Sequence, residues 1–116
     1  MSKQPTKNPQ LITSPSALLS KLDGVAAVLG QDLSLTQVRV FLYVAVNEGC
    51  SMGAMEQALK LTQSTSSRAV ALLTAIERPG RPGLGVIERV EDPYDRRTKV
   101  LSLTYKGRKA VDKILS

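Results

Sequence analysis

A segment rich in proline and glycine divides this chain of 116 residues into two parts. The segment, residues 77–85, is called the connector below; its two prolines and three glycines prevent a helix from continuing through it. Before the connector, apolar residues recur at the three- and four-residue spacing of helices, and after it they follow a strand-like pattern. The expected order is therefore four helices, a hairpin and one last helix.

Two helices are expected in the first part. The first covers residues 16–29 and stops at Gly30. Ser34 and Gln37 then have the spacing of a capping box, in which each side chain binds the other residue's backbone N–H. The run that follows, residues 38–46, is apolar on nearly all sides and predicts a buried central helix whose clearest stripe is Phe41, Leu42 and Ala45.

Two shorter helices follow, joined by a few residues. We expect Ser51 to cap a helix over residues 52–60, with an inward face of Met52, Met55 and Leu59. We expect Thr62 to cap the next helix, residues 62–77, with Ala69, Val70, Leu73 and Ile76 directed inward. Two short helices joined so tightly form a helix-turn-helix.

The second part predicts a hairpin and a final helix. Residues 86–91 are rich in β-branched side chains, residues 99–104 alternate with Leu101 and Leu103 on one face, and residues 92–98 have turn chemistry. The last helix should run from Thr104 or Tyr105 to Ile114, with an apolar side of Ala110, Val111, Ile114 and Leu115. The predicted fold class is mainly α with a small β-hairpin wing, a winged helix-turn-helix.

The charge of the chain favours a polyanionic partner. Sixteen Lys and Arg stand against ten Asp and Glu, and five of the six net positive charges lie from Leu61 onward. One Phe, three Tyr and no Trp leave few rings for stacking unpaired bases, so a duplex fits better than a single strand. The chain has no histidine, no phosphate-binding glycine loop and no clustered carboxylates, which argues against an enzyme, a metal site or a cofactor.

The remaining segments set the expected context. Cys50 lies in an apolar stretch, which favours a buried structural thiol over a redox sensor. Residues 1–15 are polar and hold three prolines, so we expect a flexible arm before a DNA-binding domain over residues 16–116. Neither a membrane-spanning run nor a signal peptide is evident, so the expected location is the cytoplasm, at the nucleoid.

The helix over residues 62–77 is the expected reading helix. Gln63, Ser64 and Thr65 at its start offer hydroxyl, amide and backbone donors for phosphates or bases. Ser64, Ser67, Arg68 and Ala71 share one side of this helix, and Arg68 suits a guanine contact or a phosphate clamp. The alternative is that the hydroxyl cluster only caps and solubilises a surface helix.

The bend of the hairpin carries the other candidate residues. Arg96, Arg97 and Lys99 lie within four residues, and an arginine on a wing can enter a narrow minor groove. Asp95 is an unusual neighbour for phosphate unless it orients an arginine through an ion pair. The alternative is a solvated turn with a loose Asp–Arg pair.

Several stretches resemble the MarR-type (multiple antibiotic resistance regulator) winged-helix proteins. These are residues 35–37, 51–61 and 64–68 in the helical part and residues 86–89, 92–97 and 101–107 in the wing, so that the resemblance covers roughly residues 34–116. It implies a DNA-binding transcription regulator, usually a two-fold dimer and often a repressor. It also implies that Arg97 enters the minor groove with Asp95 as its orienting partner, and that the major groove is faced by Gln63, Ser64, Thr65, Ser67 and Arg68.

The sequence departs from this family pattern at four places. The connector is several residues longer than usual, Ser66 stands where an apolar residue is usual, and Glu56 where a small one is. Both end helices are short, which argues against a phenol-type effector site and leaves a homodimer to use helix 16–29 and residues 111–115.

Two other functions fit parts of the pattern. Acidic residues near the wing tip, Glu91, Asp92 and Asp95, suit a winged helix that binds a protein, as an adaptor or antirepressor. An architectural protein that coats DNA with little sequence preference would instead bind with an affinity that depends strongly on salt.

Overall fold

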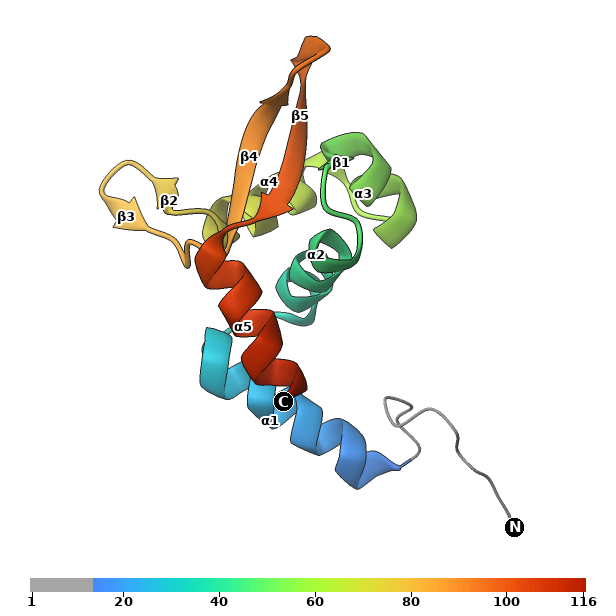
Figure 1. Cartoon of the computed structure of the whole chain (residues 1–116), viewed down its shortest axis with the longest axis vertical. Helices are drawn as coiled ribbons and strands as arrows, with labels where there is room; N and C mark the ends of the chain where they lie inside the picture. Colours follow the sequence, from blue (N-terminus) through green and yellow to red (C-terminus); the bar gives the residue numbers. More distant parts are fainter. Residues whose placement is uncertain (1–13) are drawn as a thin grey trace.

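Five helices, a three-stranded antiparallel sheet and a two-stranded one make up the computed structural model, which describes residues 14–116 (Figure 1). The elements are, in order, α1 (Pro15–Leu29), α2 (Leu35–Val46), β1 (Cys50–Ser51), α3 (Met52–Leu59), α4 (Gln63–Leu73), β2 (Ile76–Arg78), β3 (Arg81–Pro82), β4 (Ile87–Asp92), β5 (Asp95–Leu103) and α5 (Tyr105–Leu115). This order confirms the predicted winged helix-turn-helix. The β4–β5 hairpin is called the wing below.

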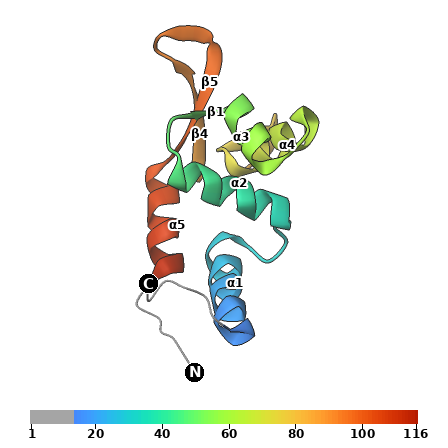
Figure 2. The same cartoon turned by 90° about the vertical axis from the view of Figure 1, so that its right-hand side faces the viewer.

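The molecule has two distinct ends. In Figure 2 the wing projects at one end, and α1 and α5 lie at the other. Helices α2, α3 and α4 pack against one another between these ends. Strand β5 of the wing contacts α2 and α3, so the wing and α4 belong to the same packed unit. Helix α1 contacts mainly α5.

The predicted helix starts are confirmed by their caps. The Ser34 backbone N–H donates to Gln37 Oε1 at 2.8 Å, and the Gln37 backbone N–H donates to Ser34 Oγ at 3.1 Å, which completes the capping box. Ser51 and Thr62 cap α3 and α4 in the expected way, and Thr104 caps α5.

Of the predicted N-terminal arm, residues 1–15, the first thirteen lie outside the described residues. Its last residue, Pro15, is the first residue of α1, and Ser14 caps this helix, because Ser14 Oγ accepts the Ala17 backbone N–H at 3.2 Å. Among residues 14–116, every helix is too short or too polar to cross a membrane.

Strand β5 is the middle strand of the three-stranded sheet, in the order β1-β5-β4. Strand β1, which was not predicted from the sequence, pairs Cys50 with Leu101. Just before β1, the carboxylate of Glu48 accepts the Leu103 backbone N–H at 3.1 Å and the Arg108 guanidinium at 2.9 Å. Glu48 thereby joins the end of α2 to β5 and α5.

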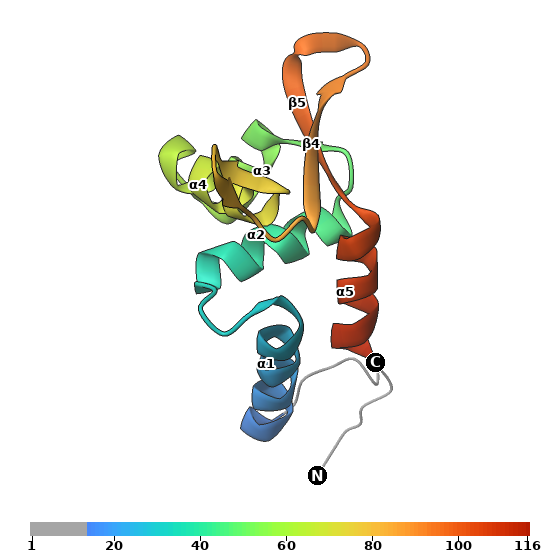
Figure 3. The same ribbon diagram turned by 90° about the vertical axis from the view of Figure 1, so that its left-hand side faces the viewer.

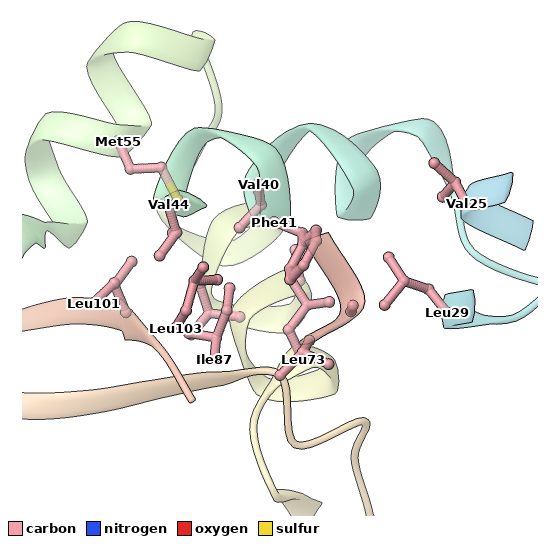
Figure 4. Close-up of a cluster of buried hydrophobic side chains, with 14 of the residues drawn as sticks. Val25, Leu29, Val40, Phe41, Val44, Met55, Leu73, Ile87, Leu101 and Leu103 are labelled. Atoms are coloured by element: carbon pink, nitrogen blue, oxygen red, sulfur yellow. The ribbon is translucent and has the colours of Figure 1, made fainter. Parts of the chain in front are cut away.

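The core lies between the sheet and the helical base (Figure 4). Helix α2 contributes Val40, Phe41 and Val44, the sheet contributes Ile87, Leu101 and Leu103, and α3 and α4 contribute Met55 and Leu73. The predicted stripe of α2 was wrong at Leu42, which is 41% exposed. A run that is apolar all round has no periodicity that singles out one face, so the packing of α4 and the sheet decides it.

Helix α4 ends at Leu73, four residues before the predicted end. Backbone N–H groups of the connector and of Val86 donate to the last carbonyls of α4 and to that of its C-cap, Thr74: Leu84 to Leu72 at 2.8 Å, Val86 to Leu73 at 2.9 Å and Gly85 to Thr74 at 3.0 Å. Such bonds satisfy carbonyls that the end of a helix leaves free. Ile76, predicted to point inward, therefore lies in β2 and is 66% exposed.

The last helix matches the prediction within one residue. Ala110 and Ile114 are buried against the core and Val111 is half-buried. Leu115, predicted on the same apolar side, is 63% exposed because no other described element covers it. It lies at the end of the molecule formed by α1 and α5.

Candidate nucleic-acid interface

Helix α4 presents a polar face opposite its buried one. Ser66, Ala69, Val70 and Leu73 are buried. The residues predicted to face DNA lie on the accessible side, where Gln63, Ser64, Thr65 and Arg68 are exposed and Ser67 is half-buried. Amphipathic periodicity alone places this polar face outward.

The start of α4 is held by hydroxyl groups. Thr62 Oγ1 accepts the Thr65 backbone N–H at 3.2 Å and donates to Thr65 Oγ1 at 2.9 Å. Thr65 Oγ1 accepts in this bond, so its own hydrogen can be donated to a further acceptor. The exposed Gln63 amide next to it can both donate and accept. The first turn of α4 therefore combines a fixed backbone with free polar groups.

Arg68 lies in a shallow polar groove between α4 and the start of α2. The groove has a volume of about 220 Å³ and is lined by Ser34, Thr36, Gln37, Thr65, Arg68 and Ala69. None of these lining residues is acidic, and Arg68 makes no ion pair within residues 14–116. Its charge is therefore available to a phosphate or a base.

Thr36 was not predicted from the sequence as a neighbour of this site. It belongs to the segment that caps α2, and the contact between α2 and α4 brings it beside Arg68. The capping box marks this segment as a helix start, but a local motif does not reveal which other helix it meets.

The tip of the wing is ordered by two aspartates. Asp92 Oδ1 accepts the Tyr94 backbone N–H at 2.8 Å, and Asp95 Oδ1 accepts the Arg97 backbone N–H at 3.1 Å. Asp95 Oδ2 also accepts the Thr98 hydroxyl at 2.9 Å. Within the described residues Asp95 forms no ion pair with an arginine, so the expected ion pair is replaced by bonds to backbone and hydroxyl. Asp95 therefore contacts Arg97 at its backbone N–H and not at its guanidinium.

The basic residues of the wing differ in how free they are. Arg96 and Arg97 are exposed, and neither forms an ion pair within residues 14–116. Lys99 stands opposite Glu91 in the register, with Lys99 Nζ 3.6 Å from Glu91 Oε2. The field of Lys99 is therefore partly neutralised, and the two arginines are the stronger ligands for an anion.

Two other features lie away from this face. An apolar cavity of about 270 Å³ is lined by residues of α1, the loop after it and the start of α2, among them Leu22, Val25, Leu33 and Val38.

Cys50 is half-buried in β1, and burial raises the pKa of its thiol above the ordinary value, which favours the predicted structural role.

The sequence of residues 31–75, which contains α2, α3 and α4, matches the model of the MarR family. A MarR-like transcriptional regulator from Thermotoga maritima is similar over 86% of this chain and 69% of its own, with 30% identity and a TM-score of 0.59. The chain belongs to the MarR family. The resemblance seen in the sequence is thus confirmed, and members of this family are transcription regulators rather than enzymes.

Other solved structures share the fold of this MarR-family chain. MarR itself is 25% identical, with a TM-score of 0.63, over 84% of this chain and 66% of its own. A MepR variant from S. aureus bound to an oligodeoxyribonucleotide is 24% identical, with a TM-score of 0.63, over 86% of this chain and 68% of its own. The chain spans 61–66% of the length of several such structures, MarR included. No curated protein matches the sequence.

Proposed function

We propose that this MarR-family chain binds duplex DNA at specific sequences and represses transcription. The observation that carries the proposal is that the exposed polar face of α4 and the arginine-tipped wing belong to one packed unit with α2 and α3. Figure 3 shows the wing and α4 joined by this unit. A reading helix with a flanking wing suits a major groove and the minor groove beside it. The MepR variant, which has the same fold, was solved with an oligodeoxyribonucleotide.

The proposed contacts follow the free groups of the site. The major groove would be read by Gln63, Ser64, Thr65, Ser67 and Arg68. Arg97 would enter the minor groove with Asp95 holding its backbone, while Arg96 and Lys99 would bind the DNA backbone. The binding unit would be residues 16–116, with Ser14 and Pro15 added by their place at the start of α1.

The acidic residues that suit a protein partner are already engaged within the wing. Glu91 pairs with Lys99, and the carboxylates of Asp92 and Asp95 accept backbone N–H groups. This arrangement supports DNA over an adaptor role. Binding of this kind requires no catalytic group or cofactor, and it would place the protein at the nucleoid in the cytoplasm.

A second copy of the chain is the proposed partner of the α1–α5 end. Exposed leucines gather there, Leu18, Leu19 and Leu22 on α1 and Leu115 on α5. A two-fold dimer through helix 16–29 and residues 111–115 would bury them and set two half-sites about one helical turn apart. Analytical ultracentrifugation of the wild type and of Leu19→Glu tests this. We expect the wild type to sediment as a dimer and Leu19→Glu as a monomer, and a monomeric wild type would contradict the proposal.

Selection of bound duplexes from a random pool at physiological salt tests the function as a whole. We expect a palindromic consensus, which indicates a dimer with two equivalent reading helices. A non-palindromic consensus would retain specific binding but remove the symmetric dimer. The absence of any enrichment would overturn the proposal and favour the adaptor or the architectural protein.

The role of Arg68 can be tested on the selected site. If it contacts a guanine, Arg68→Ala should lose about 1–3 kcal/mol of binding free energy, confined to one base position. The control is Lys109→Ala on α5, which removes the same charge outside α4 and outside the proposed dimer segments. An equal loss on every sequence would assign Arg68 to a phosphate.

A further inference from the structure

A small hairpin, β2–β3, occupies the connector directly after α4 (Figure 1). Its turn is Pro79–Gly80, and Gly80 has a φ of +77°, as a type II turn requires at this position. The pairing sets Arg78 directly opposite Arg81. Two arginines are therefore held side by side at the ends of a rigid turn.

The hairpin is firmly attached to α4. Besides the bonds that bind the last carbonyls of α4, the Gly83 backbone N–H donates to the carbonyl of Ala75 at 3.0 Å. A Cβ at Gly83 would lie 2.1 Å from the carbonyl oxygen of Thr74, so the two segments touch backbone to backbone. The backbone of the arginine pair therefore has a fixed place relative to the reading face.

The charges of the hairpin are incompletely balanced. Like charges opposite each other destabilise a strand pair. Glu77 offsets one of them, because Arg81 Nε lies 2.9 Å from Glu77 Oε1, but Arg78 is exposed and forms no ion pair within residues 14–116. A phosphate near the pair would remove the repulsion and accept the guanidinium N–H groups.

The position of the hairpin indicates which phosphate it would meet. Figure 1 places it next to the end of α4, on the opposite side of the wing's base from α3. We propose that β2–β3 is a second, smaller wing, in which Arg78 and Arg81 bind phosphates of the DNA strand bordering the groove that α4 reads. This inference rests on the proposed DNA-binding function and extends its contact surface beyond α4 and the β4–β5 wing.

The test is the salt dependence of binding to two duplexes of equal length, one with the selected site and one scrambled. Log K falls as log salt rises, and removal of one arginine–phosphate interaction should reduce the magnitude of this negative slope by about 0.9. Arg78→Ala/Arg81→Ala should therefore reduce the magnitude of the slope on both duplexes and leave the affinity ratio between them unchanged. The matched control, Lys106→Ala/Lys109→Ala on α5, removes the same charge outside the proposed dimer segments and should keep the slope.

Two further variants separate phosphate binding from folding. Arg78→Lys/Arg81→Lys retains both charges and should keep most of the slope. Arg78→Glu changes an exposed side chain that forms no ion pair with the described residues, so it should fold normally and reduce the magnitude of the slope further than Arg78→Ala does. Thermal unfolding curves of all variants check that the fold is retained.

The outcomes distinguish this inference from the function beneath it. An unchanged slope in folded Arg78→Ala/Arg81→Ala would overturn the second wing while specific DNA binding stands. A changed affinity ratio at constant slope would also overturn it, because the arginines would then read bases. A wild-type chain that binds neither duplex would overturn both.

Discussion

The hydroxyl of Ser66 donates a hydrogen bond to the carboxylate of Glu56 across the joint between α3 and α4, with Oγ 2.5 Å from Oε2. Ser66 is fully buried, and its Oγ also lies 3.0 Å from the carbonyl oxygen of Gln63. These are the two helix positions at which the sequence departs from the family pattern. The departures compensate each other, since the polar pair satisfies itself where family members are expected to pack apolar and small side chains.

The effects of removing the two partners on the free energy of unfolding should therefore not add: the double variant should lose less stability than the two single variants together. Ser66→Ala leaves the part-buried carboxylate without its donor, at a cost of about 1–3 kcal/mol in unfolding free energy. Glu56→Ala should cost less, because the Ser66 hydroxyl can still donate to Gln63. In urea unfolding, Glu56→Ala/Ser66→Ala should be less destabilised than the sum of the single variants. Additive effects would show that the two side chains are not coupled.

Two glycines should resist substitution for a steric reason. A Cβ at Gly83 would lie 2.1 Å from the carbonyl oxygen of Thr74, and one at Gly107 would lie 2.0 Å from that of Val86. We expect Gly83→Ala and Gly107→Ala to destabilise the fold by about 1–3 kcal/mol or more, because backbone must move. Gly53→Ala is the control: it lies in α3 with open space around it and should stabilise by about 0.5–1 kcal/mol. Thermal melts compare the three.

The wing tip should separate a ligand from the residue that positions it. Arg97→Ala should weaken DNA binding without changing the melting temperature, since the side chain is exposed and forms no ion pair within residues 14–116. Asp95→Ala removes the acceptor of the Arg97 backbone N–H and should weaken binding through a looser turn.

Binding titrations with the double variant test this arrangement. If Asp95 acts through Arg97, Asp95→Ala/Arg97→Ala should bind about as weakly as Arg97→Ala alone. Unchanged affinity in Arg97→Ala would remove the wing tip from DNA binding, and tighter binding by Asp95→Ala would mean that its charge mainly repels phosphate.

Cys50 should make stability depend on alkaline pH. Burial raises the pKa of its thiol in the folded chain, with a smaller opposing effect of a backbone hydrogen bond. The folded chain therefore keeps its full stability below the pKa of the thiol in the unfolded chain. It loses stability as pH rises from there through the pKa of the thiol in the folded chain. The measurement is urea unfolding across this pH range: the wild type should lose more stability than Cys50→Ala, and parallel curves would contradict the shift.

Reaction with iodoacetamide gives a second measure of the same thiol. Because the thiolate is the nucleophile, alkylation at pH 8 should be slower in the folded chain than in urea. Equal rates would mean that neither burial nor the raised pKa protects Cys50.

The site was predicted as far as its residues act locally. The capping box of Ser34 and Gln37 and the cap at Thr62 involve neighbours three residues apart, so the sequence shows them directly. The exposed face of α4 follows from helical periodicity for the same reason. The groove that joins Arg68 to Thr36 was not predictable, because its two sides are 32 residues apart in the chain.

By itself, the sequence determined the order of the five helices and the wing, the start of each helix from α2 onward and the two basic segments, because these depend on composition and on contacts between near neighbours. Only the tertiary structure decided where α4 ends, which face of α2 is buried, and that Glu56 meets Ser66. Each of these depends on a partner distant in the chain. The connector binds the last carbonyls of α4, the sheet selects Val40 over Leu42, and the turn between α3 and α4 brings a carboxylate to a buried hydroxyl.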